Sequence, residues 1–194
     1  VTKIRKYTLD LYKKLEKEVD HSAGLRLNGA LSIAQTNSRW QELKRQATTA
    51  QLYDVDIDIL DIDTIKKRYP MMRTEDLKGG VLMSGDGAAD PSGVTHMLAK
   101  AARKGGAKIF EQSPVEKILI KNKRVHGVKV NGQIIECEYI VLATGMWSRQ
   151  IGEKINVSIP LYPAEHFYVI TEPIEDLSKT LPVIRDFDSS VYFK

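Results

Sequence analysis

One segment constrains the fold of this chain more than any other, because each of its parts carries a start or stop signal. Gly79 precedes a short apolar run, and Asp90 followed by Pro91 is typical of a helix N-cap with proline at the first helical position. Apolar residues at helical spacing follow, until Gly105 ends the pattern. Strand-forming residues then occupy positions 107–111. The segment therefore predicts a strand, a helix and a second strand, the unit from which α/β sheets are built.

The residues before this segment predict helices separated by short strands. An apolar stripe at spacings of three and four residues predicts a helix over 2–19. Alternating strand formers fill 24–35, where the central Asn28-Gly29 predicts either a hairpin turn or a bulge. Asn37 is then the expected N-cap of a second helix.

The acidic run DIDILDID, 56–63, combines a strand pattern with the start of a helix. Residues 55–60 alternate and predict a short strand, and Asp63 is the expected cap of a brief helix that Pro70 stops. The run lacks the glycine and closing glutamate of a calcium loop. We therefore interpret its carboxylates as a solvated strand face.

After position 112 the pattern changes to strands. Two alternating runs meet at Asn131-Gly132, a strong hairpin signal. Residues 139–144, YIVLAT, are apolar on both faces, as a buried parallel strand requires. Residues 158–174 predict a long strand bounded by prolines, and 181–194 predict a further one.

Together these patterns indicate a mixed fold, α/β in its centre and α+β overall. Part of a doubly wound domain is expected to be interleaved with an antiparallel-sheet domain. The expected divisions are 1–78, with the leading helix; 79–152, with the strand–helix–strand unit and a β-hairpin insert; and 153–194, with strands of the antiparallel-sheet domain.

Charge and cysteine content exclude several classes of function. The net charge is only +4 and the lysines lie mostly beside acidic residues, so we expect a solvated surface and neither a nucleic-acid nor a membrane partner. The lone Cys137 excludes an internal disulfide and a cysteine-based zinc cluster, and its strand context favours a small buried hydrophobe. The four histidines show no metal-ligand spacing, so no metal site is expected.

Four blocks of sequence, in order and spacing, resemble one family of flavoenzymes. They are DGAADPSGVTHMLAKAARKGGAKIFEQSPVEKI, YIVLATGMWSRQIG, PLYPAEHFYVITEPI and LPVIRDFDSSVYF. The chain resembles the FAD-dependent amine oxidoreductases of the D-amino-acid-oxidase-like superfamily, and the block P-x-x-H-x-Y-x-x-T-E-P is similar to the dimethylglycine and sarcosine dehydrogenase branch. The resemblance spans essentially the whole chain. It implies an FAD-binding domain and a substrate domain, between which the chain crosses more than once.

The resemblance implies FAD as cofactor and five residues that contact it. The backbone of Val115 is expected to contact the adenine, and the loop with Ala143, Thr144, Gly145 and Trp147 is expected near the adenosine and pyrophosphate. Small residues at a strand end allow a cofactor to approach the backbone closely. The alternatives are an ordinary tight turn at Thr144 and Gly145, and plain core packing of Trp147.

The phosphate-binding part of such a site is not recognisable. No G-x-G-x-x-G motif occurs, and the glycine-rich GDGAADPSG lacks its spacing. Asp90 with Pro91 is expected to cap a helix and not to cradle a phosphate. We therefore expect a central fragment that begins after the dinucleotide fingerprint and contains an incomplete FAD site.

On the substrate side the resemblance implies three residues with catalytic roles. His166 and Tyr168 share one face of the predicted strand, which places two polar tips together. The resemblance places His166 beside the flavin and Tyr192 in the wall of the substrate cavity. His166 is then expected to handle the ammonium proton, and Tyr192 to orient the substrate. The alternatives are a structural histidine and a tyrosine packed in a core.

The implied function is oxidative demethylation of a small N-methylated amino acid, by hydride transfer to FAD, in one-carbon metabolism. Electrons are expected to pass to an acceptor protein or to oxygen, in the cytoplasm or, alternatively, the mitochondrial matrix. The second hypothesis is an inactive, cofactor-free fragment or binding module of the same fold. A hydroxy-acid or glycerol-phosphate oxidoreductase of the superfamily is a third, against which the block PAEHFYVITEP argues.

Overall fold

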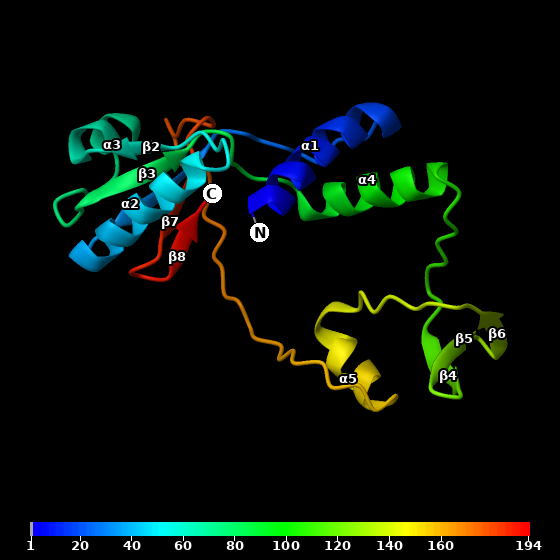
Figure 1. The fold of residues 1–194 in the computed structure, drawn as a ribbon. Coiled ribbons are helices and arrows are strands. Elements are labelled where there is room, and N and C mark those ends of the chain that lie inside the picture. Colours follow the sequence, from blue (N-terminus) through cyan, green and yellow to red (C-terminus); the bar gives the residue numbers. More distant parts are fainter. Residues whose placement is uncertain (1) are drawn as a thin grey trace. The chain divides into compact units, whose positions relative to one another are not determined.

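The computed structural model describes residues 2–194, which form two compact units. The first unit contains the described residues up to Lys108 together with Glu175–Lys194, and the second contains Ile109–Ile174 (Figure 1). The mixed α/β class predicted from the sequence is confirmed, because the first unit has a sheet that includes a parallel pair and the second has a separate antiparallel sheet. The assignment of 1–78, 79–152 and 153–194 to cofactor and substrate domains stays a prediction.

A five-stranded sheet forms the centre of the first unit, with strand order β2-β3-β1-β7-β8. Its strands are β1 (Ala30–Ala34), β2 (Asp58–Leu60), β3 (Gly79–Met83), β7 (Val183–Asp186) and β8 (Val191–Phe193). The central β1 pairs antiparallel with β3 and parallel with β7, so residues as distant in sequence as Ala30 and Val183 lie side by side. The alternation of β1 buries Leu31 and Ile33 in one apolar cluster and Ala34 in another, so the two faces of the sheet are both covered.

Four helices accompany this sheet: α1 (Thr2–Val19), α2 (Asn37–Gln51), α3 (Ile62–Arg68) and α4 (Pro91–Lys104). Leu43 and Ala47 of α2 pack on β1 and β3, while Ile65 of α3 belongs to the cluster on the other face. α1 and α4 lie side by side and share a smaller core around Val19 and Met97 (Figure 1). The predicted helix over 2–19 is therefore confirmed, and its stripe is buried towards its C-terminal end.

The predicted helix caps are confirmed at one helix and displaced at two. Asp90 caps α4, with its carboxylate accepting from Ser92 N and Gly93 N at 3.3 and 2.7 Å. The N-cap of α2 is Thr36, not Asn37, and that of α3 is Asp61, not Asp63. In both cases the earlier residue has the extended backbone that an N-cap needs, so its side-chain oxygen reaches the N–H three positions later.

Asn28-Gly29 forms no hairpin, because both residues bond to distant segments. Gly29 N donates to Asp86 O at 2.9 Å, and the Asn28 side chain donates to Lys179 O at 3.0 Å. The chain runs on directly into β1, and Gly29 adopts a φ of +92° at this point. The left-handed backbone of Gly29 serves to join three segments instead of reversing the chain.

The second unit contains a three-stranded antiparallel sheet followed by a short helical segment. Its strands are β4 (Val115–Lys121), β5 (Arg124–Val130) and β6 (Gln133–Glu136). The predicted hairpin at Asn131-Gly132 is confirmed, and both residues have positive φ, 50° and 77°. A 3₁₀ turn, η1 (Gly145–Trp147), leads into α5 (Ser148–Glu153). Cys137, just after β6, is half-buried.

Three predicted strands do not form. Residues 107–111, 139–144 and 158–174 are extended or irregular and mostly exposed, and none pairs with another strand among residues 2–194. A strand needs a neighbour to receive its backbone hydrogen bonds, and an apolar alternating pattern cannot supply that neighbour by itself. The predicted strand–helix–strand unit therefore consists of β3 and α4 alone, and both neighbours of β3 run antiparallel to it.

Candidate functional site

Tyr192 lies in the first unit, on the edge strand β8. Its backbone is opposite Arg185 of β7, and its side chain is 59% exposed, so it does not pack in a core. Arg185 is itself held by an ion pair of 3.1 Å with Asp86, in the loop after β3. The alternative of a tyrosine buried in the core does not apply to Tyr192 in this structure. Its phenol is available for contact with another molecule.

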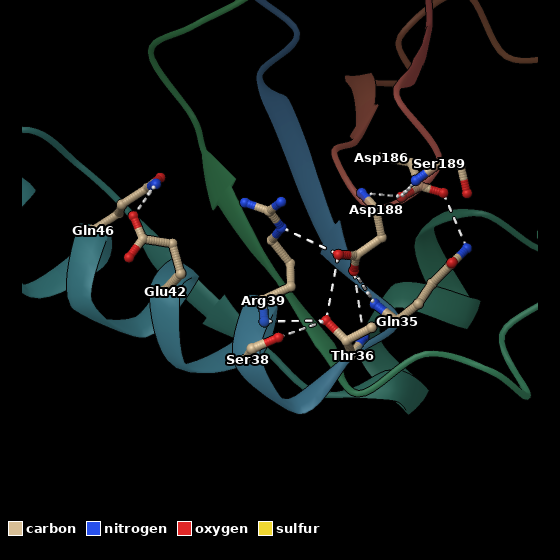
Figure 2. Close-up of polar contacts among 9 residues, drawn as sticks. All are labelled: Gln35, Thr36, Ser38, Arg39, Glu42, Gln46, Asp186, Asp188 and Ser189. Atoms are coloured by element: carbon tan, nitrogen blue, oxygen red, sulfur yellow. Dashed lines mark hydrogen bonds and ion pairs between the residues drawn. The ribbon is translucent and has the colours of Figure 1, made fainter.

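The turn between β7 and β8 is fastened to α2 and β1 by one carboxylate. Figure 2 shows Asp188 pointing from this turn towards the N-terminus of α2. Its Oδ2 accepts from the backbone N–H groups of Gln35 and Thr36, at 2.9 and 3.3 Å. Its Oδ1 accepts from the Thr36 hydroxyl and from Arg39 Nε, both at 3.3 Å. We call Gln35, Thr36, Arg39 and Asp188 the hairpin clasp.

The hairpin clasp is a charged network with little solvent around its acidic centre. The Asp188 side chain is 14% exposed. Burial alone would raise the pKa of the Asp188 carboxyl, but the backbone N–H donors and the Arg39 guanidinium outweigh it and hold the pKa below its ordinary value. Asp186 supports the same turn, because its Oδ1 accepts from the N–H groups of Asp188 and Ser189 and its Oδ2 accepts from the Gln35 side chain.

The other two predicted catalytic residues, His166 and Tyr168, lie in the second unit. They belong to an extended, exposed segment and make no hydrogen bond to any of residues 2–194. No strand forms here, so nothing fixes the His166 and Tyr168 side chains on one face. Residues that precede them in the sequence line a cavity of about 370 Å³. These residues are 158–162, Arg149 and Glu153. None of the predicted site residues lines it.

The predicted cofactor-binding residues are also in the second unit. Val115 begins β4 and is 52% exposed, and Ala143 precedes the turn η1. Thr144 Oγ1 and Ser148 Oγ are hydrogen-bonded at 2.9 Å across that turn. Thr144 and Gly145 therefore form a tight turn.

The turn η1 presents both its backbone and its aromatic residue to the outside. Gly145 has a φ of +53°, and a Cβ added to it would meet no atom within 4 Å. Trp147 is 60% exposed, which removes the core-packing alternative in this structure. Exposed small residues and an open aromatic face fit a stacked, closely approaching group such as an adenosine.

The N-terminus of α4 does not fit a phosphate. The N–H groups of Ser92 and Gly93, which an anion would need, already donate to the Asp90 carboxylate. The prediction that Asp90 caps a helix is confirmed. The exposed turn η1 fits the adenosine end of FAD, and these 194 residues contain no G-x-G-x-x-G motif for its pyrophosphate.

Sequence reasoning missed the hairpin clasp. The D-x-D spacing in the β7–β8 turn was visible, but Asp188 is about 150 residues away from each of its partners. Only the parallel pairing of β1 with β7 brings these segments together. No local pattern could have indicated it.

Comparison with known proteins relates the whole chain to flavoenzymes. It is 34% identical to the 4-methylaminobutanoate oxidase (formaldehyde-forming) of Paenarthrobacter nicotinovorans, over 100% of this chain and 24% of that protein. It is 34% identical to human mitochondrial sarcosine dehydrogenase, over 94% of this chain and 20% of that protein. It is also 31% identical to the mitochondrial pyruvate dehydrogenase phosphatase regulatory subunit of Mus musculus, over 99% of this chain and 22% of that protein. The chain thus spans between a fifth and a quarter of the length of these curated relatives.

Solved structures and family comparison agree with this relation. The L-proline dehydrogenase of P. horikoshii superposes with a TM-score of 0.86 and 27% identity, over 96% of this chain and 50% of that one. The profile of the family described as FAD dependent oxidoreductase matches residues 1–194. The resemblance stated from the sequence blocks is confirmed. The chain belongs to the FAD dependent oxidoreductase family, with sarcosine dehydrogenase and 4-methylaminobutanoate oxidase among its relatives.

Proposed function

We propose that this chain serves the FAD-dependent oxidation of a small N-methylated amino acid, of the dimethylglycine or sarcosine type. The observation that carries the proposal is 34% identity, over nearly the whole chain, to two relatives named for such substrates. Sarcosine and 4-methylaminobutanoate both combine a secondary N-methylamine with a carboxylate. A dimethylglycine dehydrogenase, 31% identical over 99% of the chain, is named for a tertiary N-methylamine that also carries a carboxylate.

Oxidation of such an amine places two demands on the protein. The nitrogen must lose its ammonium proton, because its lone pair stabilises the iminium that forms when hydride leaves the methyl carbon. The carboxylate must be held so that the methyl group faces the acceptor. FAD, when bound, accepts the hydride. The iminium hydrolyses to formaldehyde and the demethylated amine.

The proposed roles follow the chemistry of the side chains. His166 accepts the ammonium proton, which a neutral imidazole does near physiological pH. Tyr192 orients the substrate by donating a hydrogen bond from its exposed phenol. Tyr168, two residues after His166, is proposed as a second hydrogen-bonding group beside the imidazole.

The adenosine end of FAD is proposed to lie against the exposed turn of the second unit. Ala143 and Gly145 allow close approach to the backbone, and the open face of Trp147 is available for packing. The Thr144 hydroxyl is already bonded to Ser148, so Thr144 is proposed to contribute through its backbone. The backbone of Val115 is the proposed adenine contact.

Electrons are proposed to leave for an acceptor protein or oxygen, and the product to enter one-carbon metabolism. Cytoplasm and mitochondrial matrix are both proposed locations, and the matrix is supported by relatives whose names carry the word mitochondrial. Among the described residues, no helix has the length and apolar content needed to cross a bilayer.

The test is turnover of an amine panel by the purified full protein supplied with FAD. Sarcosine, dimethylglycine and 4-methylaminobutanoate are expected to reduce an artificial electron acceptor and release formaldehyde. A hydroxy acid and glycerol phosphate are expected to do neither. His166→Ala is expected to lower turnover on the order of a hundredfold, the range of general acid–base catalysis, at unchanged flavin content.

The matched control is Glu165→Ala, which changes the exposed neighbour of His166 in the same segment. Its turnover is expected to equal that of the unaltered protein. Equal losses in the two variants would show that the segment and not the imidazole matters. Oxidation of the hydroxy acid in preference to every amine would overturn the proposed substrate class.

A second candidate function is a binding or regulatory module without catalysis. It is favoured by the relative named as a regulatory subunit, which is 31% identical over 99% of this chain and 22% of that protein. This candidate predicts no turnover of any amine. A protein that binds FAD but oxidises nothing on the panel would support it against the first.

A further inference from the structure

The position of Tyr192 depends on very few backbone contacts. β8 is three residues long and lies at the edge of the sheet, where β7 is its only partner among residues 2–194. The pairing joins three positions, and Tyr192 is the middle one. An edge strand of this length is weakly held by its own ladder. What holds the turn between the two strands therefore determines where the Tyr192 phenol lies.

The hairpin clasp holds that turn through one carboxylate, which is bound by three residues outside the turn. Asp188 is four positions before Tyr192 and accepts from the end of β1, from the N-cap of α2 and from the Arg39 side chain. All four bonds have an ionised acceptor, which makes them stronger than bonds between neutral groups. The Asp188 side chain is 14% exposed, so water competes little for it.

Arg39 makes a second contact with the same turn, through the ring of Phe187. Its guanidinium carbon lies 5.5 Å from the centroid of the Phe187 ring, a cation–π contact beside the ion pair with Asp188. Arg39 is in the first turn of α2, a helix that is itself buried against the sheet through Leu43 and Ala47. The turn is thus tied to a rigid element and not to a loop.

The N-cap of α2 is part of the same network. The Thr36 hydroxyl donates to Asp188 Oδ1 and accepts from Arg39 N at 3.2 Å, so both of its functions are used (Figure 2). One hydroxyl therefore caps the N-terminus of α2 and binds the hairpin at once. Movement of the hairpin would leave the Thr36 hydroxyl without its carboxylate acceptor.

We propose that Asp188 is a positioning residue for Tyr192: the hairpin clasp sets the place of the phenol that orients the substrate amine or carboxylate. The inference rests on the role of Tyr192 in the proposed function. Asp188 itself touches neither substrate nor cofactor in this account. Its effect on the reaction passes through Tyr192 alone, which separates the proposal from a general contribution to stability.

The test combines hydrogen exchange with a double-mutant cycle. Asp188→Ala is expected to speed amide exchange of residues 191–193 while leaving exchange in β4 and β5 unchanged. In the full protein with FAD it is expected to lower kcat/KM for the amine on the order of tenfold, because a misplacement of about 1 Å can cost about a hundredfold and the displaced phenol is expected to move less. In a Tyr192→Phe background the same change is expected to leave kcat/KM unaltered.

Two further variants complete the design. Asp188→Asn keeps one acceptor oxygen for the Gln35 and Thr36 N–H groups and is expected to recover part of the loss. Glu42→Ala is the matched control, because it removes an exposed ion pair with Arg45 on the same helix without touching the hairpin. It is expected to change neither exchange in β8 nor kcat/KM.

The outcomes separate this proposal from the proposed function. A protein that oxidises none of the amines defeats the proposed function. Amide exchange of residues 191–193 instead tests whether the hairpin clasp fixes β8, and it needs no turnover. Unchanged exchange in Asp188→Ala overturns the proposal. A loss of kcat/KM that persists in the Tyr192→Phe background overturns it as well, because Asp188 would then act by another route.

Discussion

At the scale of single residues, Tyr69 couples a buried hydroxyl to the entry of the last hairpin. It follows α3, its ring lies in the apolar cluster beneath the sheet, and its hydroxyl donates to the carbonyl of Pro182 just before β7. Burial raises the pKa of the Tyr69 phenol from 10.0 to about 12. The neutral phenol is the form that both fills the core and donates the hydrogen bond.

The sign of this shift predicts how stability changes in alkali. Below pH 10 the phenol is protonated in both folded and unfolded chains, so its full contribution is present. Between pH 10 and about 12 only the unfolded chain loses the proton, so the free energy of unfolding falls.

Tyr69→Phe tests this sign. The variant is expected to be less stable than the unaltered chain at pH 7, by about 1 kcal/mol for the lost hydrogen bond. The gap is expected to narrow above pH 10. Urea unfolding at several pH values measures both, and a gap that stays constant up to pH 12 would contradict the assignment. Tyr162→Phe, at an exposed tyrosine, is the control.

At the scale of elements, the two residues Asn131-Gly132 were sufficient to predict the β5–β6 hairpin. Asn131 and Gly132 both adopt positive φ, which two-residue hairpin turns need and which these residue types tolerate. Gly132 N also donates to the Glu116 carboxylate of β4 at 2.8 Å, and this bond lowers the pKa of Glu116. The turn therefore joins all three strands of the second unit.

Gly132→Ala is expected to destabilise the second unit by about 1 kcal/mol, the cost of a left-handed backbone at a residue with a Cβ. Gly85→Ala is the matched control, because its backbone is not left-handed and an added Cβ would meet no atom within 4 Å. Amide exchange in β5 and β6 measures the difference between the two variants. Equal protection in both would show that the turn does not limit the stability of the hairpin.

The cap of α4 is a second element whose signal was sufficient. Asp90→Ala removes the acceptor of two N–H groups and is expected to cost about 1 kcal/mol of stability. It also frees those N–H groups, so the variant is expected to gain weak phosphate-dependent stabilisation that the unaltered chain lacks. Thermal unfolding with and without phosphate checks both effects. An equal response to phosphate in the two proteins would contradict the occupied-cap account.

At the scale of the whole molecule, several apolar segments remain uncovered. Phe167 and Val169 are 91% and 89% exposed, within a segment whose backbone pairs with no strand among residues 2–194. Such a segment is a template for association with another chain. The 194-residue chain on its own is expected to self-associate.

Sedimentation velocity over a range of protein concentrations measures this association. Phe167→Ser combined with Val169→Ser is expected to reduce it, at little cost in stability because neither side chain is buried. Ser32→Ala, within the sheet of the first unit, serves as a comparison and is expected to leave association unchanged. A single concentration-independent species in the unaltered chain would show that the exposed segment is covered.

Whether an element could be predicted from the sequence depends on how far apart in the sequence its interacting residues lie. Helix α1, the Asp90 cap and the Asn131-Gly132 turn were predictable, because each depends on residues within a few positions of one another. The strands expected at 107–111 and 139–144 were wrong, because strand formation depends on a distant neighbour that periodicity does not report. The caps of α2 and α3 were displaced by one and two positions, since Thr36 and Asp61, like the residues expected, carry a side-chain oxygen that can accept from a backbone N–H.

The sequence by itself determined the local elements and, through four ordered blocks, the family. It also placed His166, Tyr168, Tyr192 and the residues proposed to hold FAD at definite positions along the chain, and their roles stay predictions. Only the tertiary structure decided that β1 lies between β3 and β7, and that Asp188 thereby reaches Thr36 and Arg39. The physical reason is that a carboxylate selects its donors by distance in space, and a separation of about 150 residues is closed by the packing of the sheet and not by any pattern near either end.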